Sequence, residues 1–445
     1  MQQRMLIALL PAFMKTPRQS TRKRAGLDHV AANALDAPAS RPHVAGMDIC
    51  ILGAGVVGLT TAWMLAEAGA NVTIVDRQTG PGQEASRGNG AQLSYHFVAP
   101  LASPDTLRHL PGLLLQRDGP LRVRPGWDPG FLRWGLGFLA ACRPSVVRDT
   151  VASQLALAAL SRAEMEGLAA RLPLRFGFRR AGKLVAYRGA GSFAAARRGA
   201  DADQQVMTPD ECLALEPALR LPAAALSGGV YTASEQVGDC GAFCDGLAAQ
   251  LRARNSVAWH MGATAAPVLR DGRMVAVQAG GVEIGADAFV LALGAGAAAF
   301  ARQAGLRLPV YPMKGYSLTL RPRIPASALR HSVTDADRKV VFAPLERDGA
   351  ALIRVAGMAD MVGHDRRLDP ARLGAVRRAA EDALDVDWTA EQEPWAGLRP
   401  ATPTSRPIVG WSRVPGLFLN TGHGALGWTL ACGTARLTRD ALLPV

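Results

Sequence analysis

The chain has 445 residues, 49% of them hydrophobic and 20% charged. This length and apolar content predict two domains with a sizeable core and exclude a disordered chain. The formal net charge is +13, but the basic residues are dispersed without interleaved aromatic residues, which argues against nucleic-acid binding and leaves an anionic substrate or membrane surface compatible with the charge.

The first 46 residues differ in character from the rest of the chain. A short apolar run at 5–14 precedes a basic cluster, which is the reverse of a secretory signal and too short to span a bilayer. We expect residues 1–46 to form a disordered extension, with the hypothesis that Met47 is the natural start.

Residues 48–77 carry the pattern of a dinucleotide-binding unit. An apolar run at 49–52 predicts a buried strand, a glycine turn follows, and 56–68 predicts a helix packed on a sheet. A second strand at 71–75 ends on Asp76, where a carboxylate can bind ribose hydroxyls and disfavours a 2′-phosphate. The ligand is therefore expected to be FAD or NAD. The predicted contacts here are Gly53, Ala54, Gly55, Val56, Val57, Gly58, Asp76 and Arg77.

The middle of the chain alternates between helical and extended patterns. Small and amide-bearing residues at 84–94 suit a segment wrapped around a polar ligand. The aromatic and apolar stretch 129–144 has two readings, a helix packed on its own domain or a membrane-interface helix. The other segments expected here are a helix at 151–172, a strand at 183–187, a strand and turn at 228–239, a helix at 240–253, and strands at 256–260, 274–279 and 288–293.

A second glycine turn, Gly294–Gly296, follows the last of these strands, and the character of the chain then changes. Residues 310–320 and 351–358 predict antiparallel strands of another sheet, with a helix at 372–384. A proline-containing segment at 395–410, a strand at 417–421 and a glycine-rich segment at 422–433 close the chain.

Six cysteines are present, and their spacing fits neither a C-x-x-C pair nor a zinc site. We expect buried free thiols in a reducing cytoplasm and no metal. They are Cys50, Cys142, Cys212, Cys240, Cys244 and Cys432.

Several separate segments resemble, in order, the FAD-dependent D-amino-acid dehydrogenase (small-subunit) family, within the D-amino-acid oxidase, glycine oxidase and sarcosine oxidase group. They read I-L-G-A-G-V-V-G-L-T-T-A-W, V-Y-P-M-K-G-Y-S-L-T, G-L-R-P-A-T-P and L-F-L-N-T-G-H-G-A-L-G-W-T-L-A-C-G. The resemblance extends from Met47 to the C-terminus.

Some positions depart from the family pattern. The family's S-x-x-N-A-G-Q stands here as residues 86–92 with Gly90 and Ala91 exchanged, and the chain stops soon after Leu443. Leu352 occupies a position where relatives use Arg to hold the substrate carboxylate. Arg354 lies two residues on and shares a strand face with Leu352, so it can substitute.

The resemblance implies an α/β fold: a discontinuous Rossmann-like FAD-binding domain plus an α+β substrate domain with a mainly antiparallel sheet. The expected FAD-binding parts are 47–110, 228–308 and 395–445, and the expected substrate-domain parts are 111–227 and 309–394.

The implied activity is oxidative deamination of a D-amino acid, by hydride transfer to flavin N5 and hydrolysis of the resulting imine to a 2-oxo acid and ammonia. The resemblance also implies a quinone-type electron acceptor and a cytoplasmic location with peripheral contact to the inner face of the plasma membrane.

Further cofactor contacts are expected from three segments. The backbone N–H groups and helix N-terminus at 422–429 can face flavin N1, where negative charge develops, although a turn histidine is the plain alternative for His423. The expected contacts are Ser86, Asn89, Gln92, Gly294, Gly422, His423, Gly424, Gly427, Trp428 and Thr429.

Four side chains are the candidates for the substrate site. Arg354 and Arg399 offer a guanidinium fork for the carboxylate, Tyr316 a hydroxyl, and Lys314 a cation near the flavin. Surface arginines, core packing of the tyrosine and a solvated lysine are the alternatives.

Three other functions stay open at this point. One is an oxidase or dehydrogenase of glycine, sarcosine or an imino acid such as hydroxyproline. Another is a non-catalytic FAD-binding subunit of a larger complex, and the third is an NAD-binding regulator.

Overall fold

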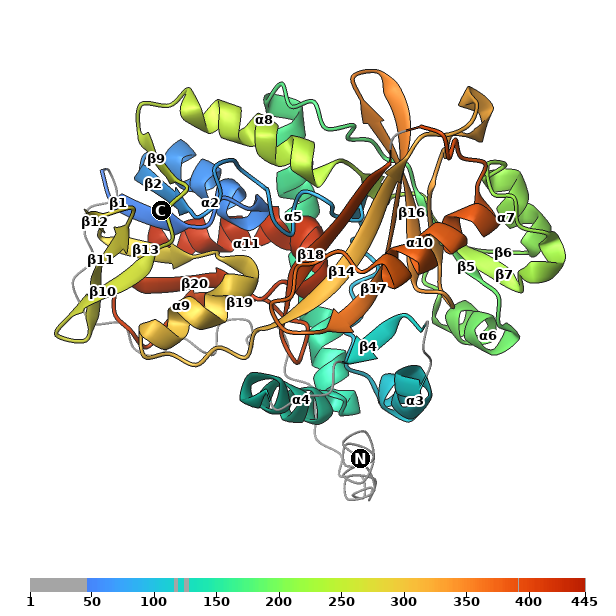
Figure 1. Ribbon diagram of the computed structural model, residues 1–445, viewed down its shortest axis with the longest axis horizontal. Helices are drawn as coiled ribbons and strands as arrows, with labels where there is room; N and C mark the ends of the chain where they lie inside the picture. Colours follow the sequence, from blue (N-terminus) through green and yellow to red (C-terminus); the bar gives the residue numbers. More distant parts are fainter. Residues whose placement is uncertain (1–45, 116–118, 124–127, 391, 445) are drawn as a thin grey trace.

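The computed structural model describes residues 46–115, 119–123, 128–390 and 392–444. Apart from Gly46, the extension expected at residues 1–46 lies outside them. Two large sheets stand side by side, and the long helix α5 (Pro144–Arg171) passes beside them (Figure 1).

A six-stranded sheet forms the dinucleotide-binding half. Its strands are parallel except for the last pair, β19 with β20, which is antiparallel. In sheet order they are β19 (Ile408–Trp411), β20 (Leu417–Thr421), β13 (Ala288–Leu291), β1 (Asp48–Leu52), β2 (Asn71–Asp76) and β9 (Val257–Met261).

Both faces of this sheet are covered, so its central strands are continuous apolar runs. Alternate residues of β1 enter different cores: Ile49 and Ile51 pack with α2 (Val56–Glu67), α8 (Cys240–Arg252) and α11 (Gly427–Leu442). Cys50 and Leu52 pack on the opposite face with α9 (Ala297–Gln303) and the small sheet of β10 (Ala266–Arg270), β11 (Arg273–Ala279) and β12 (Val282–Gly285).

A nine-stranded sheet forms the other half. Its pairs are antiparallel except β15 with β5 and β17 with β4. The order is β18 (Glu393–Ala401), β14 (Tyr311–Leu320), β17 (Ala350–Met361), β16 (Val340–Arg347), β15 (Ser332–Asp335), β5 (Lys183–Tyr187), β7 (Gly228–Thr232) and β6 (Gln204–Met207), with β4 (Leu121–Val123) on β17.

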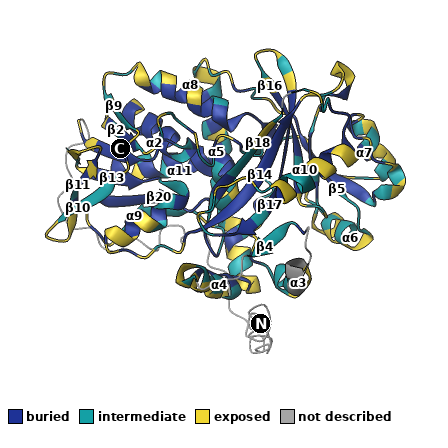
Figure 2. Cartoon of the chain, viewed as in Figure 1, coloured by how far each residue is buried: buried dark blue, intermediate teal, exposed yellow. Residues whose placement is uncertain are grey.

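Helices cover parts of this second sheet. The helix α10 (Pro370–Ala383) packs on one face through an apolar core that includes Val376 and Val355. The remaining helices are α3 (Pro104–Leu115), α4 (Pro129–Ala141), α6 (Ala190–Gly199) and α7 (Pro209–Leu215), and β3 (Gln92–Leu93) pairs with β8 (Gln236–Val237). Both sheets are dark in the burial colouring, whereas α4 and α6 show exposed faces (Figure 2).

Most segments expected from the sequence match these elements, and the differences have local causes. The helix expected at 151–172 begins earlier, because Pro144 occupies its first turn. The domain boundaries remain a proposal: β7 and β18 fall in segments proposed for FAD binding, yet both pair in the nine-stranded sheet.

All six cysteines are buried, unpaired thiols, as expected. Among the described residues, no group of His, Cys, Asp or Glu side chains is arranged to bind a metal ion. Of the helices in the described ranges, none combines the length and apolarity needed to cross a membrane.

Candidate active site

A cavity of about 1020 Å³ lies between the two sheets, at the upper end of the usual range for ligand pockets. The residues that follow the carboxyl ends of β1, β2, β13 and β20 line one part of it, including Gly53, Arg77, Leu293 and His423. Strands β14, β17 and β18 line another part. Ligands of open parallel sheets bind at such strand ends.

The glycine turn after β1 has no room for side chains. Gly53 has a φ of +114°, and a Cβ there would lie 2.5 Å from the Ala292 carbonyl oxygen. A Cβ at Gly58 would overlap the Gly53 carbonyl oxygen. These two glycines therefore keep the turn, β13 and α2 in close contact, and this leaves backbone exposed to the cavity at Gly53.

Asp76 fixes the end of β2 in the nucleotide part of the cavity. Its carboxylate accepts hydrogen bonds from the Ala54 and Gln78 N–H groups, both at 2.7 Å. Burial raises the pKa of Asp76, and these two N–H donors oppose the shift. The neighbouring Arg77 is bound by Glu84, at 2.6 Å from Nε to Oε1.

Two helix N-termini open onto the cavity. No side chain of the cap residue bonds to either α2 or α11, although Ser86 Oγ accepts from the Val56 N–H at 3.0 Å. The buried oxygens Asn420 Oδ1 and Thr421 Oγ1 border the cavity and have no hydrogen-bond partner among the described residues. The site therefore offers both anion-binding N–H groups and free polar atoms to a ligand.

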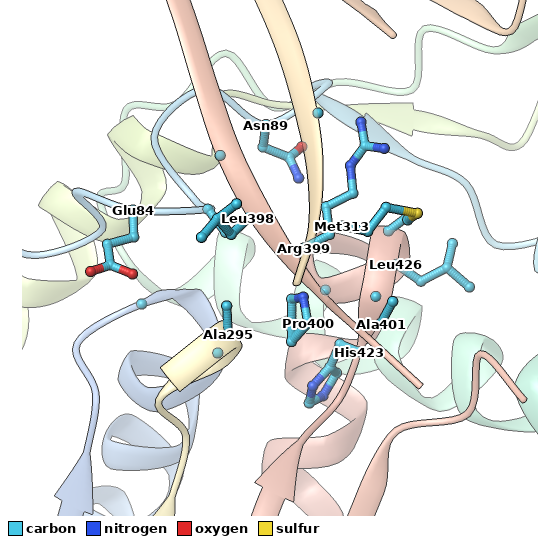
Figure 3. Close-up of a pocket in the computed structure, with 18 of the residues that line it drawn as sticks. Glu84, Asn89, Ala295, Met313, Leu398, Arg399, Pro400, Ala401, His423 and Leu426 are labelled. Atoms are coloured by element: carbon cyan, nitrogen blue, oxygen red, sulfur yellow. The ribbon is translucent and has the colours of Figure 1, made fainter. Parts of the chain in front are cut away.

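His423 lies at the α11 end of the cavity (Figure 3). Its Nε2 is 2.9 Å from Thr434 Oγ1, and burial lowers its pKa to about 3. The imidazole is therefore neutral at physiological pH.

The segment 86–94 crosses the nine-stranded sheet and is bonded to several of its strands. Ser317 of β14 donates to the Gly88 carbonyl at 2.9 Å, and Gln92 donates to Thr334 of β15 at 3.3 Å. Lys183 of β5 donates to Ser94 Oγ at 2.9 Å. The position of this segment is therefore set by the sheet beneath it.

Arg399 and Tyr316, two of the four candidates for the substrate site, line the sheet side of the cavity. Arg399 Nη1 donates to the Met358 carbonyl at 3.0 Å, and its guanidinium lies over Gly315, where a Cβ would overlap it. Figure 3 shows Arg399 pointing away from His423, toward the side where Asn89 lies. The Tyr316 hydroxyl donates to buried Asp360 at 3.2 Å.

Arg354 and Lys314, in contrast, do not line the cavity. Arg354 is 3% exposed, and its Nη1 donates to the Asn89 carbonyl at 3.0 Å, beneath the 86–94 segment. Lys314 donates to the Arg367 carbonyl and lies 3.9 Å from Asp365. Both side chains are used to hold backbone and loops in place, so the structure does not support the direct substrate contact expected for them.

Of the residues predicted to contact the cofactor, most line the cavity. Ala54, Gly58 and Gly422 do not, although their neighbours do. Those that line it are Gly53, Gly55, Val56, Val57, Asp76, Arg77, Ser86, Asn89, Gln92, Gly294, His423, Gly424, Gly427, Trp428 and Thr429.

Sequence reasoning missed several lining residues, above all Lys183, Phe97 and Trp395. The Trp395 ring packs over Gly88 and Gly397, where a Cβ would overlap it. Lys183 carried one available signal, because it is one of only five lysines and opens the strand expected at 183–187.

Comparison with known proteins identifies relatives over nearly the whole chain. Residues 48–441 match the family described as FAD dependent oxidoreductase. A protein of Ralstonia nicotianae named D-amino acid dehydrogenase 2 is 46% identical over 416 residues, covering 89% of this chain and 96% of its own. A protein of the same name from Pseudomonas aeruginosa is 48% identical over 400 residues, covering 88% and 94%.

Solved structures share the fold at lower sequence identity. Glycine oxidase from Geobacillus kaustophilus superposes with a TM-score of 0.67 at 22% identity, covering 89% of this chain and 95% of its own. Iminodiacetate oxidase from Chelativorans sp. BNC1 gives 0.65 at 22% identity, with the same coverage.

Proposed function

The chain belongs to the FAD-dependent oxidoreductase family, and from this premise we propose that it is a dehydrogenase that oxidises D-amino acids to 2-oxo acids and ammonia. The observation that carries the proposal is one continuous cavity, which joins the glycine turn of a dinucleotide site to Arg399 on the facing sheet.

The residues of the cavity fit FAD. Gly53 leaves room for close approach of a pyrophosphate, the α2 N-terminus favours phosphate charge, and Asp76 suits a ribose. The N-terminus of α11, with His423, Trp428 and Thr429, would hold the flavin ring and favour negative charge on it. Bound FAD would supply the ring that accepts a hydride from the substrate.

The chain's own residues would bind and orient the amino acid. Arg399 is half-buried, and in the described residues it has no carboxylate within ion-pair distance, so it can pair with the substrate carboxylate. The Tyr316 ring closes the same wall, with its hydroxyl held by Asp360. Aromatic and aliphatic side chains from α4, including Phe131 and Phe138, line the cavity and would limit the access of water to the substrate.

Anaerobic mixing with D-amino acids tests the proposal. The purified holoprotein should be yellow, and a D-amino acid should bleach its flavin absorbance without partner proteins, whereas the L-enantiomer should not. Failure of all D-amino and imino acids to bleach it would contradict the proposal and favour a non-catalytic FAD-binding subunit.

We further propose that the electrons pass to a quinone-type acceptor and that the protein contacts the inner face of the plasma membrane. Support comes from three exposed leucines at the edge of the cavity, Leu101, Leu132 and Leu136, which offer an apolar surface next to the site. Turnover with a soluble quinone and little peroxide would agree with this proposal. Stoichiometric peroxide from oxygen would identify an oxidase.

A further inference from the structure

Lys183 is a buried cation in the cavity that the proposed reaction does not use. Its side chain is 6% exposed and lines the same cavity as Arg399. The ammonium donates to Ser94 Oγ at 2.9 Å and lies 4.3 Å from the centre of the Phe97 ring.

Lys183 forms no ion pair with any carboxylate of the described residues. Glu235 is the carboxylate whose charge reaches it, but the oxygens of Glu235 already accept from Tyr95 N, His96 N and His96 Nδ1 at 2.7–2.9 Å. Burial lowers the pKa of Lys183 to about 8, so the ammonium is still largely charged at neutral pH. A buried charge is costly unless an anion pairs with it.

The position of Lys183 assigns this missing anion to the substrate. Lys183 belongs to β5 of the nine-stranded sheet, the sheet that carries Arg399, whereas the first glycine turn and Asp76 belong to the six-stranded sheet. It contacts the last residue of the 86–94 segment, beyond Asn89 and Gln92. Lys183 and Arg399 thus both line the part of the cavity formed by the nine-stranded sheet. Four strands lie between β5, which carries Lys183, and β18, which carries Arg399.

We infer that Lys183 is a specificity-determining residue that binds a second carboxylate, the side-chain carboxylate of an acidic D-amino acid whose α-carboxylate pairs with Arg399. This inference rests on the proposed D-amino-acid oxidation. D-glutamate and the longer D-2-aminoadipate carry such a second carboxylate at the end of the side chain and are the candidate substrates.

Matched substrates and variants test the inference. D-glutamate and D-glutamine differ only in the terminal charge and its hydrogen bonds, so the ratio of their kcat/KM values isolates the second carboxylate. We expect about a 30-fold preference for D-glutamate, which Lys183→Met or Lys183→Gln reduces to about one. Lys339→Met, the same change at an exposed lysine on the cavity rim, should leave the ratio unchanged.

Binding of unreactive acids gives a second readout that does not depend on turnover. Glutarate should perturb the absorbance of the bound flavin at lower concentration than butyrate, and Lys183→Met should remove this difference. A wild-type enzyme without preference for acidic substrates would overturn the inference. A Lys183 variant that shifts the reduction potential of the flavin and slows the oxidation of every substrate equally would also overturn the inference.

These outcomes are distinct from failure of the proposed function. If no D-amino acid reduces the flavin but glutarate still binds through Lys183, the dehydrogenase proposal fails and the carboxylate site stands. If D-alanine and D-glutamine are oxidised as well as D-glutamate, the dehydrogenase proposal stands and the role of Lys183 fails.

Discussion

At the scale of single residues, the position of the Arg399 guanidinium depends on the lack of a side chain at Gly315. Its guanidinium occupies the space over Gly315, and a Cβ there would overlap it. Burial lowers the pKa of Arg399, but the guanidinium of arginine stays charged at neutral pH. Under the proposed function, a substrate carboxylate would therefore meet a guanidinium whose position is fixed on one side by Gly315.

Arg399→Ala should leave the substrate carboxylate unpaired and lower kcat/KM by about 30-fold or more. This estimate follows from the cost of roughly 2–5 kcal/mol for truncating one partner of a buried charge pair. Arg399→Lys should recover only part of this loss, because the ammonium lacks the planar fork. Steady-state kinetics of the FAD-loaded variants check this. Unchanged kinetics in Arg399→Ala would place the substrate carboxylate elsewhere.

His423 gives a prediction about stability and pH. Its pKa is about 3 in the folded protein against an ordinary value of 6.5. Between these pH values the unfolded chain binds more protons than the folded one, so the free energy of unfolding falls as the pH is lowered from 6.5 toward 3.

The variant His423→Asn should lose this contribution, about 1.4 kcal/mol per pH unit in the window. Urea unfolding of both proteins at pH 6.5, 6.0 and 5.5 measures it, since their difference cancels the other titrating groups. A difference that stays constant with pH would contradict a buried, neutral imidazole.

The candidate residues divide according to what a sequence can reveal. His423 was proposed because glycines surround it, and Arg399 because it sits in a recognisable motif, and both residues line the cavity. Lys314 and Arg354 do not line the cavity, and neither residue type nor strand alternation specifies what a long side chain reaches. The register of β14 shifts between Lys314 and Tyr316, and such a bulge left no recognisable signal in the sequence.

At the scale of elements, α2 packs directly on the first glycine turn, and a Cβ at Gly58 would overlap the Gly53 carbonyl oxygen. Gly58→Ala would force the helix away from Gly53, with an expected cost of about 1–3 kcal/mol in unfolding free energy and weaker FAD binding. Gly167→Ala in α5 is the matched control, because a Cβ at Gly167 would meet no atom within 4 Å. The free energy of unfolding of this control variant should rise by up to about 1 kcal/mol.

Urea unfolding and the recovery of FAD fluorescence on release measure both variants. Equal effects of the two substitutions would contradict a special role for the α2 contact.

Helix α4 packs on its own domain with one face and exposes leucines on the other, and its contact with a membrane stays a proposal. Trp134 and Phe138 are buried against Tyr311 and neighbouring strands, whereas Leu132 and Leu136 are 40% and 63% exposed. Leu136→Glu should reduce co-sedimentation with anionic lipid vesicles several-fold, because a charge is costly in the apolar interface. Leu155→Glu on α5, a leucine 41% exposed but outside the cavity lining, serves as control. Equal binding by both variants would remove α4 from the proposed membrane contact.

At the scale of the whole molecule, the sequence revealed the first sheet better than the second. Long apolar runs bounded by glycine, such as those of β1, β13 and β20, are strong local signals. Strands β15 and β16 were not expected, since β15 is short and the pairing of both is set by distant partners in β5 and β17. The cavity depends on this distant pairing, so its lining was only partly predictable.

The arrangement of the six-stranded sheet also bears on how the protein matures. In this sheet Ile49 stands beside Ala288, and the next strand, β20, with its helix α11, lies at the end of the chain. During synthesis the first glycine turn therefore emerges well before the strands and the helix that complete its crevice. A chain truncated before β20 would lack this part of the crevice, and we expect it not to retain FAD.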